Sequence, residues 1–448
     1  MLNHQETICA LATANGIGAI SVIRVSGNKS WEIVSKIFSK SLIGKVSHTA
    51  HFGTISDEGK LIDEVLITIF ADGKSFTGEE SAEIACHGSP FIQQQIIKIL
   101  TKNGCRLAKP GEYTQRAFLN GKMDLSQAEA VADLIAAQSR SSHEIALKQL
   151  RGGFSSELKD LRDKLIHFAS LVELELDFAE EDVEFADRTE LKALVKSVLA
   201  YVSRLAESFE LGNAIKTGVP VAIVGAPNTG KSTLLNQLLG DDRAIVSDIA
   251  GTTRDVIEET LNIEGILFRL IDTAGIREGA EEIEAMGIVR SKEKIDQAKI
   301  VLCLADASVS TSIEEVKTWV SELESTYPNK RIQLIVNKSD LNASAEGIAI
   351  SAKEGENIET LKEWMVNSVL DGFDMANETI VSNARHYEAL VKTAEALEKA
   401  LNGLETNISA DWVAIDIRQA MFELGTITGD ISTDDLLGNI FAKFCIGK

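Results

Sequence analysis

Residues Gly225 to Thr233 read GAPNTGKST and directly follow an apolar run, Val219 to Val224. A continuous apolar run that ends in glycine predicts a buried parallel strand. The pattern GxxxxGKS between such a strand and a helix predicts a loop whose backbone N–H groups surround phosphates. In such a loop Lys231 reaches the β- and γ-phosphates, and Ser232 is a ligand of Mg²⁺. The stretch therefore predicts a nucleotide-binding P-loop.

Similar apolar runs accompany the later motifs of this region. They comprise Leu267 to Ile271, Ile300 to Leu304, Gln333 to Val336 and Ile348 to Ile350. Helical segments separate them, and this alternation is typical of parallel sheets covered by helices on both faces. We therefore expect an α/β P-loop domain with a mostly parallel, doubly wound sheet.

Two polar segments at strand ends identify the base. Residues 337–340 read NKSD and follow the run that ends at Val336. The Asp340 carboxylate can accept hydrogen bonds from both N1–H and the 2-amino group of guanine, which adenine does not offer. Residues 351–353 read SAK, where backbone amides can reach the guanine carbonyl oxygen. We therefore expect GTP to be preferred over ATP.

Two further segments are expected to lie near the γ-phosphate. Residues 272–275 read DTAG, in which Asp272 suits the outer Mg²⁺ shell and the Gly275 amide suits the γ-phosphate. Residues 247–255 read SDIAGTTRD and lie where a GTPase places its first switch, with Thr253 as the second hydroxyl ligand of Mg²⁺. Taken together, the motifs give one predicted set of GTP-binding residues. They are Asn228, Thr229, Gly230, Lys231, Ser232, Thr233, Ser247, Asp248, Ile249, Ala250, Gly251, Thr252, Thr253, Asp272, Thr273, Ala274, Gly275, Asn337, Lys338, Ser339, Asp340, Ser351, Ala352 and Lys353.

The residue after DTAG departs from a common pattern. Many regulatory GTPases carry a glutamine there that orients the attacking water, whereas this chain has Ile276. A carboxylate farther along must replace it, with Glu284 and Glu282 as candidates, or hydrolysis must await a partner. Asn228, inside the P-loop, offers a side-chain oxygen that could hold a monovalent cation beside the phosphates. We expect Glu284 and Lys231 to be the catalytic residues.

Length and charge limit the possible classes of protein. A chain of 448 residues exceeds the size at which one core keeps growing, so two or three domains are expected. Its 44% hydrophobic and 25% charged residues are typical of soluble globular proteins. A net charge of -22 argues against a general basic surface for nucleic acid. Any RNA contact must be local or supplied by a partner.

Cysteine usage and the chain's apolar runs predict its compartment. The five cysteines are scattered, without the spacing of a zinc site or a disulfide framework. The first residues lack the features of a signal or transit peptide, and no apolar run approaches the roughly 20 residues that span a bilayer. We therefore expect a soluble cytoplasmic protein without a membrane span.

The chain divides into regions of different texture. Residues 1–120 alternate short β-type runs with turn-formers and one expected helix, Pro90 to Lys102, which predicts an α+β domain. Residues 121–214 and 374–448 are helical in pattern, whereas residues 215–373 carry the nucleotide motifs. The simplest topology is one helical domain in two parts, with the α/β domain inserted between them.

Local signals support the helical region. Ser126 and Glu129 have the spacing of a capping box, and apolar residues from Leu125 to Ile135 recur at intervals of three and four. Residues 173–190 are strongly acidic, which indicates a solvated helix face or a helix junction.

The C-terminal cysteine permits two interpretations. The last four residues read C-I-G-K, which is not a prenylation signal because glycine occupies an aliphatic position. Cys445 is therefore either a buried small hydrophobe or a reactive thiol near Lys443 and Lys448.

Several segments taken together resemble one family. They read IRVSG (23–27), SFTGEESAEIACHG (75–88), PGEYTQRAFLNGKMDLSQAEA (110–130), GAPNTGKST (225–233), DIAGTTRD (248–255), DTAGIRE (272–278) and FCIGK (444–448). The chain is thereby similar to the MnmE family, also called TrmE, over nearly its whole length. The resemblance implies a homodimer through an N-terminal folate-binding domain, in a heterotetramer or larger complex with an FAD protein of the MnmG type. It also implies that tRNA is bound largely through that partner.

The resemblance further implies a reaction and its residues. Members add an aminomethyl or carboxymethylaminomethyl group to C5 of the tRNA wobble uridine, with 5,10-methylene-tetrahydrofolate as the carbon source and 5-formyl-tetrahydrofolate as its analogue. K⁺-stimulated dimerisation of the GTPase domains triggers hydrolysis. The implied folate contacts are Arg24, Glu83, Lys122 and Lys448; the K⁺ ligands are Asn228, Ser247, Ile249 and Thr252; the Mg²⁺ ligands are Ser232 and Thr253; and the water-orienting residue is Glu284.

One segment departs from the family pattern. Asn15 to Gly18 reads NGIG, where the family usually has a loop of the Pro-Gly-Arg-Gly-Gly type. A second class of function also stays open, a GTPase that acts as an assembly factor, for instance on ribosomes, with its terminal domains used for docking.

Overall fold

The computed structural model describes residues 6–177, 188–242, 259–271, 292–342, 346–375, 377–406 and 408–447. The chain forms two compact units. The first unit comprises Met1–Ala132, Gln149–His167 and Met421–Lys448, and the second comprises Asp133–Lys148 and Phe168–Ala420. Each unit is described by itself.

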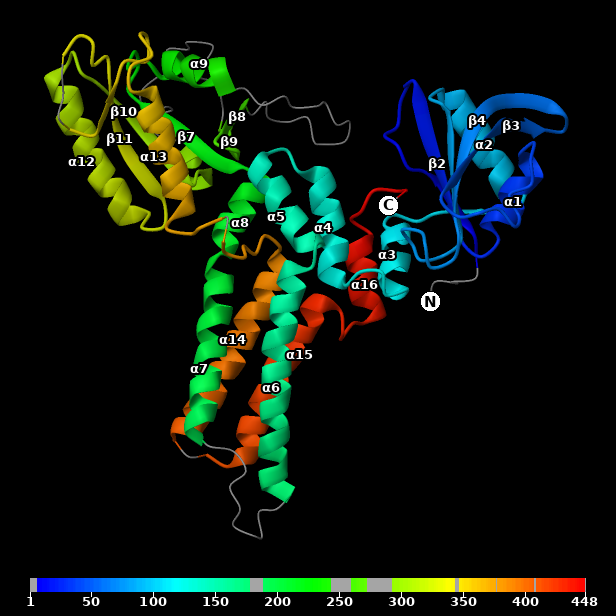
Figure 1. The fold of residues 1–448 in the computed structure, drawn as a ribbon. Helices are drawn as coiled ribbons and strands as arrows, with labels where there is room; N and C mark the ends of the chain where they lie inside the picture. The colour runs from blue at the N-terminus through cyan, green and yellow to red at the C-terminus, as the bar shows by residue number, and fades with distance from the viewer. Residues whose placement is uncertain are drawn as a thin grey trace. The chain divides into compact units, whose positions relative to one another are not determined.

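A mixed sheet dominates the first unit (Figure 1). Within the described residues its strand order is β3-β4-β5-β2-β1-β6. The strands are β1 Ile8–Leu11, β2 Ile20–Ser26, β3 Thr49–Asp57, β4 Lys60–Phe70, β5 Ser81–His87 and β6 Arg106–Leu107. Neighbouring strands are antiparallel except β1 and β6, which are parallel. The antiparallel strands β3 and β4 are joined by the tight turn at Glu58 and Gly59.

Helices α1 (Ser30–Ile37) and α2 (Pro90–Lys102) pack on the apolar face of this sheet. Alternate strand residues such as Ile23, Ile67 and Ile84 are buried there together with Ile96 and Leu100 of α2. Proline at the first helical position is compatible with an α-helix because its missing N–H needs no partner there. The predicted bounds of α2 are confirmed.

Helices α3 (Glu112–Leu119), α4 (Leu125–Ala136) and α16 (Asp434–Phe441) also contribute to the first unit. The predicted capping box at Ser126 was wrong. The box is formed by Asp124, whose carboxylate accepts from the Gln127 amide at 2.9 Å, and Gln127, whose side chain accepts from the Asp124 amide at 2.9 Å. Ser126 is the second helical residue, and its hydroxyl donates to Asp124. The apolar stripe is buried at Leu125 and Ala128 but not at Ile135, which is exposed.

The second unit contains the α/β domain. Its described strands follow the order β12-β11-β10-β7-β9-β8. They are β7 Val219–Gly225, β8 Glu259–Ile263, β9 Ile266–Leu270, β10 Ile300–Asp306, β11 Arg331–Asn337 and β12 Ile348–Ile350. All neighbouring pairs are parallel except β8 and β9, which form a hairpin. The antiparallel strand β8 escaped the sequence analysis, but the sheet is mostly parallel as predicted.

Both faces of this sheet are covered by helices (Figure 1). Val221 and Ile223 of β7 face a core shared with α8 (Phe209–Thr217), α9 (Lys231–Asp242) and α13 (Ile358–Leu370). Ala222 and Val224 face the opposite core, which α12 (Ser310–Thr326) completes. This alternation explains why β7 is apolar at every position, as a parallel strand buried on both faces must be.

Long helices form the rest of the chain. They are α5 Arg140–Leu150, α6 Gly153–Asp177, α7 Arg188–Glu207, α14 Ala384–Glu405 and α15 Ala410–Thr428. In the second unit α7 packs along α14. The acidic segment predicted as a helix face or junction is only partly covered, because residues 178–187 lie outside the described residues.

The chain enters and leaves the α/β domain at one place. α8 leads into β7, and the Ser208 hydroxyl before it accepts from the Val381 amide at 3.0 Å. The Val381 carbonyl lies so close to α8 that a Cβ on Gly212 would meet it at 2.2 Å. Neighbouring entry and exit points suit a domain inserted into a helical scaffold. The predicted domain boundaries at residues 120, 214 and 373 remain a prediction.

Candidate functional site

The phosphate-binding loop lies between the carboxyl end of β7 and the first residue of α9. β7 ends at Gly225 and α9 begins at Lys231. The Lys231 ammonium donates to the carbonyl oxygens of Gly225 and Ala226 at 2.9 and 2.8 Å. The Thr229 hydroxyl donates to the Ala226 carbonyl at 2.9 Å. The lysine therefore lies against the loop backbone, in the position from which it can neutralise phosphate oxygens.

Asn337 connects this loop to the guanine side of the site. Its amide nitrogen donates to the Thr229 carbonyl at 2.8 Å, and its amide oxygen accepts from the Ala352 backbone N–H at 3.0 Å. Asn337 is 3% exposed, so both bonds are shielded from water. A Cβ on Gly230, whose φ is +94°, would lie 2.2 Å from the Asn337 amide nitrogen. Glycine is thus required at this P-loop position for the two motifs to meet.

The base-recognition residues are held by their neighbours. The Ser351 hydroxyl donates to the Asp340 carboxylate at 2.7 Å, and the Ser339 amide donates to the Ile350 carbonyl at 3.0 Å. These bonds align the end of β11 with the end of β12. The Asp340 carboxylate is thereby held at the carboxyl ends of these two strands.

Lys338 is held by an ion pair. Its ammonium lies 2.5 Å from the Asp306 carboxylate at the end of β10. Burial alone would raise the pKa of the Asp306 carboxyl, but hydrogen bonds from Lys338 and Ser308 outweigh burial and lower it. The pair keeps the lysine stem extended across the site.

Several predicted site residues lie outside the described residues. They are Ser247, Asp248, Ile249, Ala250, Gly251, Thr252, Thr253, Asp272, Thr273, Ala274, Gly275, Ile276, Glu282, Glu284 and Lys448. The other predicted residues lie in two places. The P-loop and the start of α9 contain Asn228, Thr229, Gly230, Lys231, Ser232 and Thr233. The end of β11 and the residues after β11 and β12 comprise Asn337, Lys338, Ser339, Asp340, Ser351, Ala352 and Lys353. The structure thus brings the predicted phosphate-binding residues and the predicted base-binding residues to the same edge of the sheet, where Asn337 contacts Thr229.

The described residues include part of the predicted cation sites. Ser232 is the second residue of α9 and is exposed, as a hydroxyl ligand of a nucleotide-bound Mg²⁺ must be. Asn228 is exposed and has a φ of 63°. Among the residues the structure describes, no group of three or more His, Cys, Asp or Glu side chains could hold a metal ion.

The first unit contains a second cluster of predicted site residues. Arg24 and Glu83 face each other on adjacent strands β2 and β5, and Arg24 donates to Glu83 Oε1 at 2.9 and 3.0 Å. The Arg24 guanidinium lies 5.5 Å from the Phe76 ring centroid and 5.6 Å from that of Tyr113. The Tyr113 hydroxyl donates to the Arg24 carbonyl at 2.8 Å. The ion pair is partly exposed and lies beside the exposed Phe76 ring, whereas Tyr113 is buried beneath it.

Lys122 lies near the same loop as Phe76. Its ammonium donates to the Gly73 carbonyl at 3.1 Å, and its stem is 3.2 Å from where a Cβ on Gly78 would lie. Arg24, Glu83 and Lys122 therefore all border the segment from residue 71 to residue 83. The structure brings these three predictions together.

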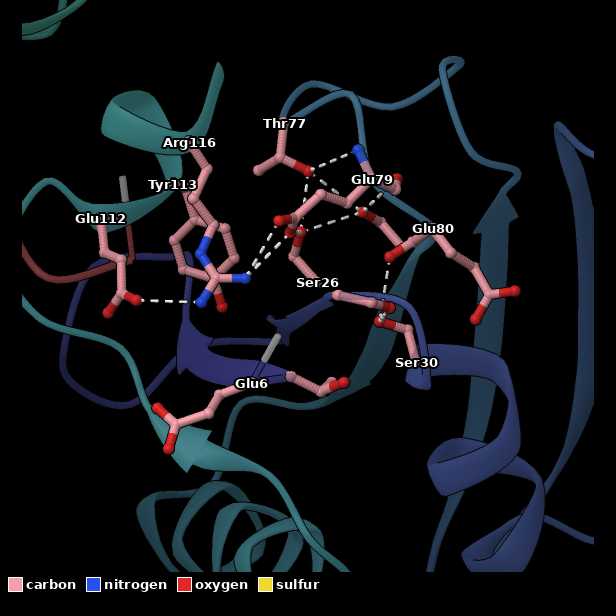
Figure 2. A network of polar contacts seen from close by, with 12 residues as sticks. Glu6, Ser26, Ser30, Thr77, Glu79, Glu80, Glu112, Tyr113 and Arg116 are labelled. Carbon is pink, nitrogen blue, oxygen red and sulfur yellow. Dashed lines mark hydrogen bonds and ion pairs between the residues drawn. The ribbon is translucent and has the colours of Figure 1, made fainter. Parts of the chain in front are cut away.

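A buried polar network fixes this segment (Figure 2). Arg116 is 2% exposed and bonds Glu79 and Glu112, each at 3.0 Å. Glu79 in turn accepts from the Ser26 hydroxyl at 2.8 Å. Because each charge in this network has an opposite partner, the network can stay buried. The segment that carries Phe76 is therefore held rigidly at one end.

The C-terminal segment packs in the first unit. The Gly111 amide donates to the Cys445 carbonyl at 3.4 Å, and a Cβ on Gly447 would lie 2.2 Å from the Leu11 carbonyl. The interpretation of Cys445 as a buried hydrophobe was wrong, because its side chain is exposed and only its backbone is held. Exposure is compatible with the alternative of a reactive thiol.

Sequence reasoning missed several residues of both clusters. Phe76 and Tyr113 were quoted within motifs, but nothing in their spacing placed them over Arg24. Asp306 follows a predicted strand, and its position at the same sheet edge as Lys338 was the available signal. The two hydrogen bonds of the Asn337 side chain, to Thr229 and to Ala352, had no sequence signal of their own.

Comparison with known proteins matches both parts of the chain. A family model described as the MnmE helical domain matches residues 125–445, and one described as GTP-binding protein TrmE N-terminus matches residues 7–122. A Cytophaga hutchinsonii protein described as tRNA modification GTPase MnmE is 53% identical over 457 residues, covering 100% of this chain and 98% of the relative. The chain belongs to the MnmE family.

A second relative agrees with this assignment. A Flavobacterium johnsoniae protein with the same description is 52% identical over 464 residues, covering 99% of this chain and 100% of the relative. Among solved structures, the Era protein of Aquifex aeolicus bound to GDP and AlF₄⁻ matches 40% of this chain and 66% of its own at 26% identity, with a TM-score of 0.24. At that score the structural match adds nothing to the sequence relatives.

Membership of the MnmE family confirms the resemblance predicted from the quoted segments. The predicted fold class is also confirmed: an α+β N-terminal domain, a helical domain and an α/β P-loop domain of the MnmE type. In the part of the chain that the structure describes, no helix has both the length and the apolar character to cross a membrane.

Proposed function

We propose that the GTPase activity of this MnmE-family chain serves the modification of tRNA. The observation that carries the nucleotide part is Asn337, which ties the P-loop at Thr229 to the base-recognition segment at Ala352. The printed description of the relatives, tRNA modification GTPase, supports the tRNA part.

Each described site residue has a role in GTP binding. The Lys231 ammonium exchanges its bonds to loop carbonyls for bonds to the β- and γ-phosphates, and the amides at the start of α9 add to it. The Asp340 carboxylate accepts the two N–H groups of guanine. Ser232, together with the predicted ligand Thr253, would hold Mg²⁺, and the ion would supply positive charge where negative charge develops during phosphoryl transfer.

The water that attacks the γ-phosphate needs an orienting group. Ile276 has no polar atom for this role, so we assign it to Glu284. Glu284→Ala should lower kcat with little change in nucleotide affinity, because an oriented water contributes mainly in the transition state. Glu282→Ala is the matched control. Loss of affinity with unchanged kcat in Glu284→Ala would contradict this role.

Potassium is the proposed activator of hydrolysis. Asn228 offers an exposed side-chain oxygen at the phosphate end of the site, and Ser247, Ile249 and Thr252 would complete the coordination. A cation there, joined by self-association of two GTPase domains, would do the work of an arginine finger. GTP turnover should rise steeply when K⁺ replaces Na⁺, and equal rates in both salts would remove the hypothesis.

The first unit is the proposed folate site. Glu83 can accept from the amide and amino groups of a pterin, while Arg24, Lys122 and Lys448 suit the carboxylates of the folate's glutamate tail. A bound methylene-tetrahydrofolate would supply the one-carbon group that is attached to C5 of the wobble uridine. The reaction would take place in a homodimer of this chain together with an FAD partner of the MnmG type. The Arg24 and Glu83 ion pair beside Phe76 supports this proposal.

Calorimetry with 5-formyl-tetrahydrofolate tests the folate site. The full-length protein should bind it, and Glu83→Ala should abolish binding. Glu64→Ala is a matched control because Glu64 is an exposed acidic residue on the neighbouring strand β4. No heat with the native chain would refute folate binding.

Mass analysis of tRNA tests the function as a whole. Wobble uridines from a strain lacking this gene should lack the C5 substituent, and the native gene should restore it. A restored strain carrying Lys231→Ala should remain deficient if GTP turnover is required. Unchanged modification in the deletion strain would favour the assembly-factor alternative.

A further inference from the structure

The turn between β8 and β9 rests on the first turn of α5. The Ser141 amide, at the second position of α5, donates to the Gly265 carbonyl at 3.1 Å. A Cβ on Gly265 would lie 3.2 Å from both the Arg140 Cβ and the Ser141 hydroxyl. All of these residues belong to the second unit. A helix amide that has no partner within the first turn of its helix is thus satisfied by the α/β domain.

The turn itself is a tight two-residue hairpin. Ile263 pairs with Ile266, and Glu264 and Gly265 between them have φ values of 49° and 87°. Two successive residues with positive φ are typical of the type I′ turn, which favours glycine at its second position. The Gly265 amide also donates to the Asn262 side chain at 3.1 Å. The hairpin is therefore a stiff element that moves as one piece.

Both ends of this hairpin join predicted nucleotide-sensing segments. β8 begins at Glu259, shortly after the predicted first switch ends at Asp255. β9 ends at Leu270, directly before the predicted DTAG segment begins at Asp272. The hairpin is therefore continuous in sequence with both predicted segments.

α5 contacts the α/β domain along one face. Besides Ser141, Ile145 packs against the core that contains the β-strands, and the Lys148 ammonium donates to the Glu378 carbonyl at 2.8 Å. Positions 141, 145 and 148 recur at helical spacing and lie on the same side of the helix. α5 therefore runs from the hairpin at its first turn to the exit segment at its last.

The exit segment is also held by α7, where Glu378 pairs with Arg204 at 3.0 Å and the Arg204 guanidinium lies 3.8 Å from the Phe373 ring centroid. Among the described residues α5 itself makes one hydrogen bond to each place, from Ser141 to Gly265 and from Lys148 to Glu378. A single hydrogen bond contributes roughly 1 kcal/mol net. A shift of the hairpin can therefore change its contact with α5 at small energetic cost.

Space for such a movement exists beside α5. A cavity of about 30 Å³ lies between α4, α5 and α8, lined among others by Ile145 and Ile215. This is enough for about one water molecule, so a small helix shift would not require repacking of a filled core. The ion pair between Asp133 of α4 and Lys216 of α8, at 2.7 Å, borders the same cavity.

We propose that the contact between Gly265 and Ser141 couples the nucleotide state of the α/β domain to the helical scaffold through α5. The proposal rests on the proposed GTPase cycle and adds where the cycle is read out. Because coupling between two sites is reciprocal, a partner that fixes α5 would also change nucleotide affinity. The helical scaffold would thus respond to the bound nucleotide and would also change the affinity for it.

The test compares two glycines in matching turns. Glu58 and Gly59 form an equivalent turn between β3 and β4, with φ values of 49° and 82°, and nothing lies within 4 Å of a Cβ on Gly59. Gly59→Ala and Gly265→Ala therefore impose the same backbone strain, of about 1 kcal/mol. Only Gly265→Ala also pushes against α5. A difference between the two variants measures the contact.

The readout is amide hydrogen exchange of the peptide covering residues 138–150 in the full-length protein. Its exchange rate should differ about tenfold between GDP and GDP with aluminium fluoride, the usual scale of coupling between sites. Gly265→Ala should reduce the difference to less than about twofold while Gly59→Ala retains it. Ser141→Pro, which removes the donor without removing an intrahelical bond, should act like Gly265→Ala.

The outcomes separate this proposal from the proposed function. No nucleotide-dependent exchange in the native chain, or its persistence in Gly265→Ala or Ser141→Pro, would overturn the coupling. GTP turnover measured on the same samples tests the GTPase cycle independently. A native chain that fails to hydrolyse GTP would refute the proposed function instead.

Discussion

Replacing Asn337 by alanine should uncouple the two halves of the nucleotide site. The change removes one hydrogen bond to the Thr229 carbonyl and one from the Ala352 amide, both in a side chain that is 3% exposed. Each bond contributes roughly 1 kcal/mol net, and the orphaned buried carbonyl and amide add a penalty. A total of about 2–4 kcal/mol follows, part of it lost from folding and part from nucleotide binding.

The assay is titration of a fluorescent GDP analogue, with urea unfolding of the nucleotide-free protein beside it. If about 2 kcal/mol falls on binding, affinity drops roughly thirtyfold. Asn342→Ala is the control, because that asparagine makes a hydrogen bond to the Ala307 carbonyl and none to the P-loop. An Asn337→Ala protein that is folded and binds GDP within about threefold of the native affinity would refute the bridging role.

Three further predictions concern both units. Asp340→Asn should switch the preferred nucleotide from GTP to xanthosine triphosphate, because the new amide can donate a hydrogen bond to the 2-oxo group of xanthine. Competition binding with the two nucleotides tests this. Arg116→Met should lower the free energy of unfolding by about 3 kcal/mol, since it removes the arginine paired with Glu79 and leaves Glu112 with Arg106 alone. Chemical denaturation beside the native protein measures it. Burial would raise the pKa of the Glu112 carboxyl, but hydrogen bonds from Arg106, the Lys109 amide and Arg116 outweigh burial and lower it. The stabilisation by Glu112 is therefore complete above the ordinary glutamate pKa and is lost as pH falls through the lowered value. In Glu112→Gln the free energy of unfolding should fall less steeply with decreasing pH, as acid titration of the two proteins would show.

Much of the fold could be predicted because it depends on local pattern. The apolar runs at β7, β10 and β11 are buried on both faces, so each strand shows in the sequence without knowledge of its neighbours. The helix α2 likewise carries its own start at Pro90. β8 was missed because an antiparallel strand of five residues, alternating at Leu261 and Ile263, gives a weak signal.

The capping box shows how a local signal can mislead. Ser126 and Glu129 fit the expected pair of residue types, but Asp124 and Gln127 fit it as well two positions earlier. Both pairs have the same spacing, so only the bonds actually made distinguish them. A motif of two residues does not determine where a helix begins.

The candidate site divides in a similar way. The P-loop and the NKSD segment were predictable because a backbone conformation or a ligand group dictates each residue. The Arg24 and Glu83 pair depends on strands β2 and β5 being neighbours, and the Lys338 and Asp306 pair on β10 and β11 being neighbours. Such contacts link residues far apart in sequence, and periodicity does not report them.

The close approach of the Val381 carbonyl to Gly212 has a consequence for the history of this architecture. Because the chain enters and leaves the α/β domain at one place, a gene segment encoding it could join the helices without separating them. The same helical scaffold could then accept a different nucleotide-binding domain at this position.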